Sequence, residues 1–224
     1  MPDESAEGPL KAIGKMIDDL TAFMWDAFTA LNVNGITGDY AEFGSAGATS
    51  IGAAHSVIRH SPTPRHMWAF DSFEGLPETS DALDQHPAFV PGVGQGGVEA
   101  FHARCAAKGI PRSAYTTVEG YFADTMAQIG PDGPPADIAL AYVDCNLYSS
   151  TVTTLDFLRP RLKHGMIVAF DDYFCWTSTT VSGERMALHE FLTANPEWHF
   201  ERYKDPTWGA VSYVVERADA LDPR

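Results

Sequence analysis

Short apolar runs alternate with longer helix-type segments along most of this chain, and this order restricts the fold more than any other feature. The run DIALAYV at 137–143 has almost no polar residue, which is typical of a strand covered by helices on both faces. Repeated strand–helix units produce parallel strands joined by right-handed crossovers. The sequence therefore predicts an α/β fold around a mostly parallel sheet. Strands are expected at 39–43, 66–71, 114–118, 137–143, 165–170, 198–203 and 209–216.

The last two expected strands are joined by a loop too short for a crossover helix, so we expect them to pair antiparallel. This places a C-terminal antiparallel hairpin at one edge of a seven-stranded, doubly wound sheet with helices on both faces. Apolar residues at helical spacing predict a long amphipathic helix over 10–31, whose wide apolar stripe suits packing or a contact in a homodimer. Further helices are expected around 51–58, at 97–109, at 151–162 and at 184–194.

The length of 224 residues suits a single domain, expected to span 1–224 with a helical N-terminal segment at 1–35. The formal net charge of −15 argues against a nucleic acid or an anionic membrane as partner, because both need a basic face. No apolar run approaches the length of a membrane span and the N-terminus is acidic, so a cytoplasmic location is expected. Three cysteines without a CxxC pair favour reduced thiols.

One long irregular segment interrupts the regular order of strands and helices. Residues 79–98, TSDALDQHPAFVPGVGQGGV, are rich in glycine and proline and have neither strand nor helix periodicity. Loops of this length in compact domains are usually lids or binding loops, although a disordered insertion has the same composition. The sequence leaves a lid over a site and a disordered insertion as alternatives.

Acidic residues and glycines stand where the first two strands end, the edge at which open parallel sheets bind their ligands. Glu42 is followed by Gly44 and Gly47, a spacing that lacks the GxGxxG pattern of dinucleotide sites and equally suits a simple tight turn. Asp71 ends the second strand, where a carboxylate either accepts the hydroxyls of a ribose or caps the local turn. The two carboxylates together favour a nucleoside ligand.

Two later strands end in a second set of oxygen-bearing side chains. Asp144 and Asn146 follow the strand at 137–143, and Asp171 and Asp172 follow the strand at 165–170. Because these strands are expected to be neighbours, three carboxylates should converge at one edge of the sheet. Such a cluster suits Mg²⁺, Ca²⁺ or Mn²⁺, although each aspartate alone is equally explained as a cap. The flanking Cys145 and Cys175 match no zinc spacing and are interpreted as packing residues.

Four stretches, WAFDSFEGLPE, EGYFADTM, VDCNLYSS and GMIVAFDDY, resemble in this order the metal-dependent macrocin and mycinamicin sugar O-methyltransferase family. The similarity extends over roughly residues 39–216. It implies a Rossmann-like class I methyltransferase fold, S-adenosyl-L-methionine as methyl donor, and Mg²⁺ or another divalent ion. It also implies that the acceptor is a sugar hydroxyl of a natural product or of a small saccharide or oligosaccharide.

The resemblance assigns roles to the strand ends. The methionine part of the cofactor would lie against the first strand end and its glycine turn, the ribose against Asp71, and the metal ion between Asp144, Asp171 and Asp172. The family usually has aspartate where Asn146 stands, so one ligand or base is neutral in this chain. The residues expected to contact the cofactor are Glu42, Gly44, Ser45, Gly47, Ser50, Asp71, Ser72, Phe73, Glu119, Gly120, Tyr121 and Asp144.

Methyl transfer to an alcohol needs a base beside the metal ion, because the alcohol proton is held tightly at neutral pH. The candidates are Asp144, His102 next to the long loop, and His189 after the metal strand. Two other functions remain open: methylation of a catechol-like diol, and non-catalytic binding of a nucleoside. Four aromatic residues are candidates for stacking on a sugar ring, with core packing as the alternative: Tyr148, Tyr173, Trp176 and Trp208.

Overall fold

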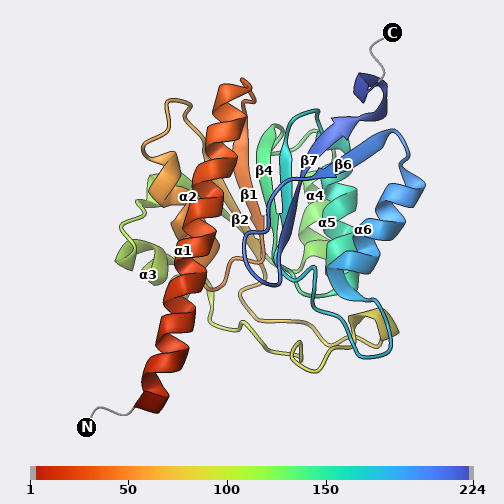
Figure 1. Ribbon diagram of the computed structural model, residues 1–224. Helices are drawn as coiled ribbons and strands as arrows, with labels where there is room; N and C mark the ends of the chain where they lie inside the picture. The colour runs from red at the N-terminus through yellow and green to blue at the C-terminus, as the bar shows by residue number, and fades with distance from the viewer. Residues whose placement is uncertain (1–3, 222–224) are drawn as a thin grey trace.

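A computed structural model describes residues 4–221 and contains one seven-stranded sheet (Figure 1). The strand order is β3-β2-β1-β4-β5-β7-β6, in which β7 alone runs antiparallel to both of its neighbours. The predicted mostly parallel sheet with a C-terminal hairpin at one edge is confirmed. The strands are β1 (Asp39–Phe43), β2 (Met67–Asp71), β3 (Tyr115–Glu119), β4 (Ile138–Val143), β5 (Ile167–Phe170), β6 (Trp198–Arg202) and β7 (Val211–Arg217).

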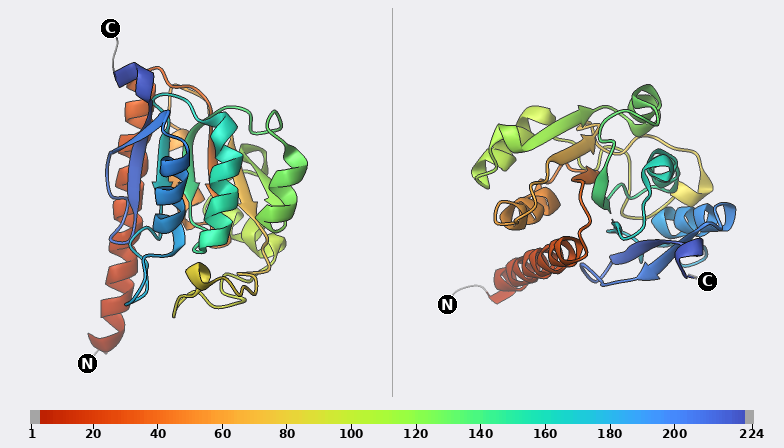
Figure 2. Two further views of the ribbon diagram at one scale, coloured as in Figure 1. Left: turned by 90° about the vertical axis from the view of Figure 1, so that its right-hand side faces the viewer. Right: turned by 90° about the horizontal axis from the view of Figure 1, so that it is seen from above.

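Helices cover both faces of the sheet (Figure 2). One core contains apolar residues of α1, α2 and α3, and the other contains residues of α4, α5 and α6. The eight-residue α4 was not among the helices expected from the sequence. The helices are α1 (Glu4–Val33), α2 (Thr49–Ile58), α3 (Val98–Ala107), α4 (Phe122–Ile129), α5 (Tyr148–Leu158) and α6 (Gly183–Ala194).

The long first helix, α1, packs only part of its length on the sheet. Met24 and Phe28 lie fully within the core, whereas Ile13, Met16 and Ile17 are 51%, 38% and 40% exposed. The N-terminal end of α1 extends beyond the loops at the carboxyl edge of the sheet (Figures 1 and 2). None of the helices within residues 4–221 combines the length and apolar character needed to cross a membrane.

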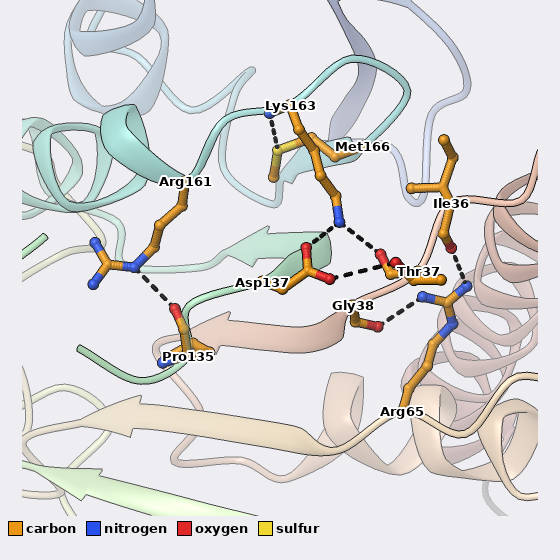
Figure 3. Close-up of polar contacts among 9 residues, drawn as sticks. All are labelled: Ile36, Thr37, Gly38, Arg65, Pro135, Asp137, Arg161, Lys163 and Met166. Carbon is orange, nitrogen blue, oxygen red and sulfur yellow. Dashed lines mark hydrogen bonds and ion pairs between the residues drawn. The ribbon is translucent and has the colours of Figure 1, made fainter. Parts of the chain in front are cut away.

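Basic side chains fasten the opposite, amino edge of the sheet (Figure 3). The Arg65 guanidinium donates to the carbonyl oxygens of Gly38 and Ile36, each at 2.7 Å. Lys163 forms an ion pair with Asp137 and donates to the carbonyl of Thr37 at 2.7 Å. These contacts satisfy three carbonyls of the loop that precedes β1 and fix that loop at the amino edge of the sheet.

The four central parallel strands end at the same level. Phe43 of β1 pairs with Phe70 of β2 on one side and with Val143 of β4 on the other. Val143 in turn pairs with Phe170 of β5. The strand order reverses between β1 and β4, which is where open α/β sheets form a ligand crevice. The residues that follow these four paired positions, and therefore meet at one edge, are Gly44, Asp71, Asp144 and Asp171.

Candidate active site

A pocket opens at this carboxyl edge, above the ends of β1 and β4. Its walls come from the loops after β1, β2, β3 and β4, together with the irregular segment that precedes α3. The pocket is lined by Gly44, Ala46, Gly47, Asp71, Ser72, Gly75, Leu76, Pro77, Val93, Gly94, Tyr121, Phe122, Asp144, Cys145, Asn146 and Ser150.

Gly44 lets the backbone after β1 pass unusually close to β4. Its φ is +96°, a conformation that L side chains rarely adopt. A Cβ atom built at this position would lie 1.9 Å from the carbonyl oxygen of Asp144. Only glycine therefore permits the two strand ends to approach each other as they do here.

The carboxylate of Asp71 binds three backbone amides of the surrounding loops. Its Oδ2 accepts hydrogen bonds from the N–H groups of Ser45 at 2.7 Å and Ala46 at 2.9 Å. Its Oδ1 accepts from the N–H of Phe73 at 2.6 Å. Asp71 therefore fixes the glycine turn after β1 relative to the loop after β2, as in the turn-capping alternative. Its contact with a ribose stays a prediction.

Glu42 is a fully buried carboxylate one position before the end of β1. Burial raises its pKa to about 7, against hydrogen bonds that lower the pKa, the foremost of them from Tyr40. The Tyr40 hydroxyl donates to Oε2 at 2.5 Å, while Oε1 has no hydrogen-bond partner in the described part of the chain. Glu42 thus lies two residues before Gly44, and its Oε1 can still accept a hydrogen bond.

The remaining residues predicted to contact the cofactor are divided between the pocket wall and its surroundings. The side chain of Phe73 is buried against Phe101 with ring centroids 5.2 Å apart, and Glu119 is exposed at the end of β3. Of the predicted set, those that line the pocket are Gly44, Gly47, Asp71, Ser72, Tyr121 and Asp144, and those that do not are Glu42, Ser45, Ser50, Phe73, Glu119 and Gly120.

Three aspartates converge beside the pocket. Asp144, Asp171 and Asp172 each offer an oxygen within 4.8 Å of the others, and they form the one group of this kind in the described residues. Burial is the main cause that raises the pKa of all three carboxyls. Repulsion by the neighbouring carboxylates raises the pKa of Asp144 and Asp172 further, and that of Asp172 reaches about 6. The arrangement therefore holds negative charge where water solvates it poorly.

Polar donors approach this acidic cluster from three sides. The Tyr142 hydroxyl donates to Asp171, and the Asn146 amide donates to Asp172 Oδ2. The thiol of Cys175 donates to Asp172 Oδ1 at 3.3 Å. These contacts hold the carboxylates together. The Tyr142 contact has no signal in the sequence, because the tyrosine lies within an otherwise apolar strand.

The chemistry of the donor set fits a hard divalent ion. Carboxylate oxygens are the ligands preferred by Mg²⁺, Ca²⁺ and Mn²⁺. Burial and the neighbouring Asp172 raise the pKa of the Cys175 thiol to about 12, and burial raises that of Cys145 well above its usual value. Both shifts favour the protonated thiol, which is a poorer metal ligand than a carboxylate oxygen. The residues present suit an oxygen-bound ion held by the three aspartates.

The two histidines predicted as bases lie elsewhere. His102 on α3 shares a hydrogen bond of 2.9 Å with the hydroxyl of Tyr115, the first residue of β3. His189 is exposed on α6. The structure does not bring either histidine into the acidic cluster, whereas Asp144 belongs to both the cluster and the pocket wall.

The irregular segment 72–97 crosses the pocket and is fastened at both its base and its tip. At the base, the carbonyl of Phe73 accepts the N–H of Gly97 at 2.8 Å. At the tip, the buried Asp84 accepts hydrogen bonds from the N–H and Oγ of Ser149 on α5, at 2.8 and 2.7 Å, and from Thr79 Oγ1 at 2.7 Å. These contacts fasten the segment, called the strap below, to the rest of the domain, and its role as a lid stays a prediction. The strap includes the predicted 79–98 almost completely.

Replacing Asp84 with alanine is expected to loosen this strap, because it removes three hydrogen bonds to the tip. We expect the free energy of unfolding to fall by about 2 kcal/mol and the affinity for S-adenosylhomocysteine to fall about tenfold. Calorimetric titration and thermal unfolding measure the two effects. Asp81→Ala is the matched control, since Asp81 is exposed and accepts only from Leu83 within the strap itself. Equal affinities for the two variants would contradict a fastening role for Asp84.

Comparison with known proteins identifies two related enzymes. The 8-demethyl-8-(2,3-dimethoxy-alpha-L-rhamnosyl)-tetracenomycin-C 4'-O-methyltransferase of Streptomyces olivaceus is 32% identical over 164 residues, which are 70% of this chain and 59% of that protein. The mycinamicin III 3''-O-methyltransferase of Micromonospora griseorubida is 27% identical over 175 residues, 70% of this chain and 61% of that protein. The chain thus spans less than two thirds of the length of either relative.

Solved structures show the same fold. The O-methyltransferase NovP matches with a TM-score of 0.75 at 22% identity, over 89% of this chain and 80% of that chain. The O-methyltransferase TomG from Streptomyces achromogenes, solved in complex with S-adenosylmethionine, matches with a TM-score of 0.55 at 15% identity, over 96% of this chain and 91% of that chain. The sheet and its helices are therefore a Rossmann-like methyltransferase fold.

The sequence also matches a profile described as Macrocin-O-methyltransferase (TylF) over residues 13–195. This stretch includes β1 to β5, every loop that lines the pocket, and all three aspartates of the acidic cluster. Because the match extends over well more than half of the sequence, the chain belongs to the macrocin O-methyltransferase (TylF) family.

Proposed function

We propose that this protein is an O-methyltransferase that uses S-adenosylmethionine and a divalent metal ion to methylate a hydroxyl of a sugar. The observation that carries the proposal is the adjacency of the pocket and the acidic cluster, because Asp144 belongs to both. A donor in the pocket and an acceptor at the cluster would then meet at the end of β4. The strand reversal between β1 and β4 supports this proposal, because open α/β sheets commonly bind ligands at such a reversal.

The relatives support a sugar as the acceptor. One relative is named as an O-methyltransferase of a rhamnosyl-tetracenomycin, and the other as a 3''-O-methyltransferase of mycinamicin III. We therefore propose a deoxysugar of a natural product, or a small saccharide, as the acceptor class of this chain. Sugars offer adjacent hydroxyl groups, and two neighbouring oxygens suit an ion that takes several oxygen ligands.

The chain's own residues would divide the work of transfer. The backbone at Gly44, which has no side chain, and the glycine turn held by Asp71 would leave room for the methyl donor. Leu76 and Val93 of the strap would exclude water from the bound methyl donor. Asp144, Asp171 and Asp172 would hold the divalent ion, which supplies a lowered pKa for an acceptor hydroxyl.

Orientation and proton removal complete the proposed reaction. Holding the acceptor oxygen in line with the donor methyl lowers the entropic part of the barrier. Asp144 is the proposed base, because it is the carboxylate that lies both in the cluster and on the pocket wall. Asn146, which also lines the pocket, carries a neutral amide that cannot take the proton at this position.

A methyl-transfer assay with and without EDTA tests the proposal. Labelled S-adenosylmethionine would be offered with monosaccharides, oligosaccharides and natural-product glycosides that have free adjacent hydroxyls, and separately with catechol. We expect transfer to a sugar that stops with EDTA and returns with Mg²⁺. Transfer to catechol alone would indicate a diol methyltransferase, since phenols ionise far more readily than sugar alcohols. Cofactor binding without turnover on any acceptor would indicate a non-catalytic nucleoside-binding protein.

A further inference from the structure

Glu184 is a buried fourth carboxylate behind the acidic cluster, and the proposed reaction does not use it. It lies in the first turn of α6 and is 0% exposed. Its Oε2 accepts a hydrogen bond from the backbone N–H of Asp172 at 2.9 Å, while Oε1 has no partner among the described residues. Burying a carboxylate with an unpaired oxygen is costly, so its presence here calls for a functional explanation.

The first residues of α6 pack closely enough against neighbouring loops to bury this carboxylate. Gly183 has a φ of +58°, and a Cβ atom at this position would lie 3.3 Å from the carbonyl oxygen of Asn146 and 3.6 Å from that of Cys175. The helix therefore begins in close contact with the loops after β4 and β5, which carry the three aspartates. Glu184, the next residue, enters between these two loops.

The contact with Asp172 differs from the other contacts of the cluster. Asn146 and Cys175 donate to the carboxylate oxygens of Asp172, which are the atoms a metal ion would use. Glu184 instead accepts a hydrogen bond from the backbone N–H of Asp172, so it orients the residue without using either carboxylate oxygen. A helix cap alone would not need this depth, because a carboxylate in the first turn also interacts favourably with the helix dipole when it is exposed.

We infer that Glu184 is a positioning residue of the divalent-ion centre, which holds the Asp171–Asp172 turn so that both carboxylates face the ion. The inference rests on the proposed metal dependence. Groups that hold metal ligands in place commonly contribute 10- to 100-fold to metal affinity, roughly the size of effect expected here. Glu184 acts through Asp172 and does not itself touch the acceptor or the donor.

The test measures Mn²⁺ affinity by electron paramagnetic resonance for two variants. One removes the charge of the side chain and keeps its length, and the other shortens the side chain and keeps its charge. Glu184→Gln keeps an acceptor oxygen at the same distance and is expected to retain most of the wild-type affinity. Glu184→Asp keeps the charge but is one methylene shorter, so it loses the bond to Asp172, and the affinity should fall roughly 10- to 100-fold. Binding of S-adenosylhomocysteine without metal, expected to be unchanged, shows that each variant is folded.

A control on the same helix separates this effect from a general effect of α6. Glu190 is exposed and accepts a hydrogen bond from the Tyr148 hydroxyl at 2.6 Å, and Glu190→Asp should leave Mn²⁺ affinity unchanged. The inference is overturned if Glu184→Asp binds Mn²⁺ like the wild type, or if Glu184→Gln loses as much affinity as Glu184→Asp. A wild-type protein that binds no Mn²⁺ would overturn the proposed metal dependence and this inference together.

Discussion

Replacing Asp171 with alanine is expected to abolish methyl transfer while S-adenosylmethionine still binds. The change removes one of the three carboxylates of the acidic cluster, whereas the pocket is lined by Asp144 and not by Asp171. A metal ion stabilises the charge of a transition state by several kcal/mol, and about 4 kcal/mol corresponds to roughly a 10³-fold loss of rate. Initial rates with a sugar acceptor measure the loss, and calorimetric titration with S-adenosylhomocysteine measures the retained cofactor site.

Two controls accompany the Asp171 variant. Asp156→Ala removes an exposed carboxylate from α5 and should leave the rate unchanged, which separates loss of a ligand from loss of one negative charge. EDTA applied to the wild type should reproduce the Asp171→Ala result, and added Mg²⁺ should restore only the wild type. Transfer that survives both chelation and the substitution would refute the proposed role of the metal.

Replacing Gly44 with alanine is expected to have the largest effect on stability. The new methyl group would lie 1.9 Å from the Asp144 carbonyl oxygen, and the φ of +96° is itself strained for alanine. The strands β1 and β4 would have to separate, so the free energy of unfolding should fall by at least about 3 kcal/mol. For a domain of this size that corresponds to a decrease of roughly 10 °C in Tm, measured by thermal unfolding.

Gly47→Ala is the matched comparison for stability. Gly47 lies in the same turn, but a Cβ atom there would meet only Thr49 Oγ1, at 3.6 Å. Its Tm should therefore stay close to that of the wild type. The two alanine variants together distinguish the close approach of two strands from a general demand for glycine in the turn, and equal Tm values would rule out the close approach as the cause.

The sheet could be predicted from the sequence because each strand carries its own local signal. The apolar run that became β4 and the short loop before β7 were sufficient to give the parallel centre and the antiparallel hairpin. The helix α4, FADTMAQI, was missed because it has only eight residues, so the helical spacing of Phe122, Met126 and Ile129 extends over little more than two turns. The meeting of Asp144 with Asp171 followed from the adjacency of their strands, a relation that topology alone determines.

Contacts between distant segments left no such signal. Asp84 reaches Ser149 across 65 residues of sequence, and nothing in the composition of the strap marks this aspartate among its neighbours. Tyr142 lies among apolar residues of β4, as an ordinary core tyrosine would, yet its hydroxyl donates a hydrogen bond to Asp171. His102 was a reasonable candidate by its closeness to the strap in sequence, but its partner proved to be Tyr115. Side-chain direction, which these three cases depend on, is set by tertiary packing.

The alignment of β1, β2, β4 and β5 at one level limits how this scaffold can diversify. A shift of one residue in any of these strands would turn its terminal side chain to the opposite face of the sheet. An insertion within a strand would therefore separate the residues that meet at the carboxyl edge. A connecting segment can change its length without turning the side chains of a strand. A designer seeking new acceptors should therefore vary a segment such as 173–182, between β5 and α6, and keep every strand at its present length.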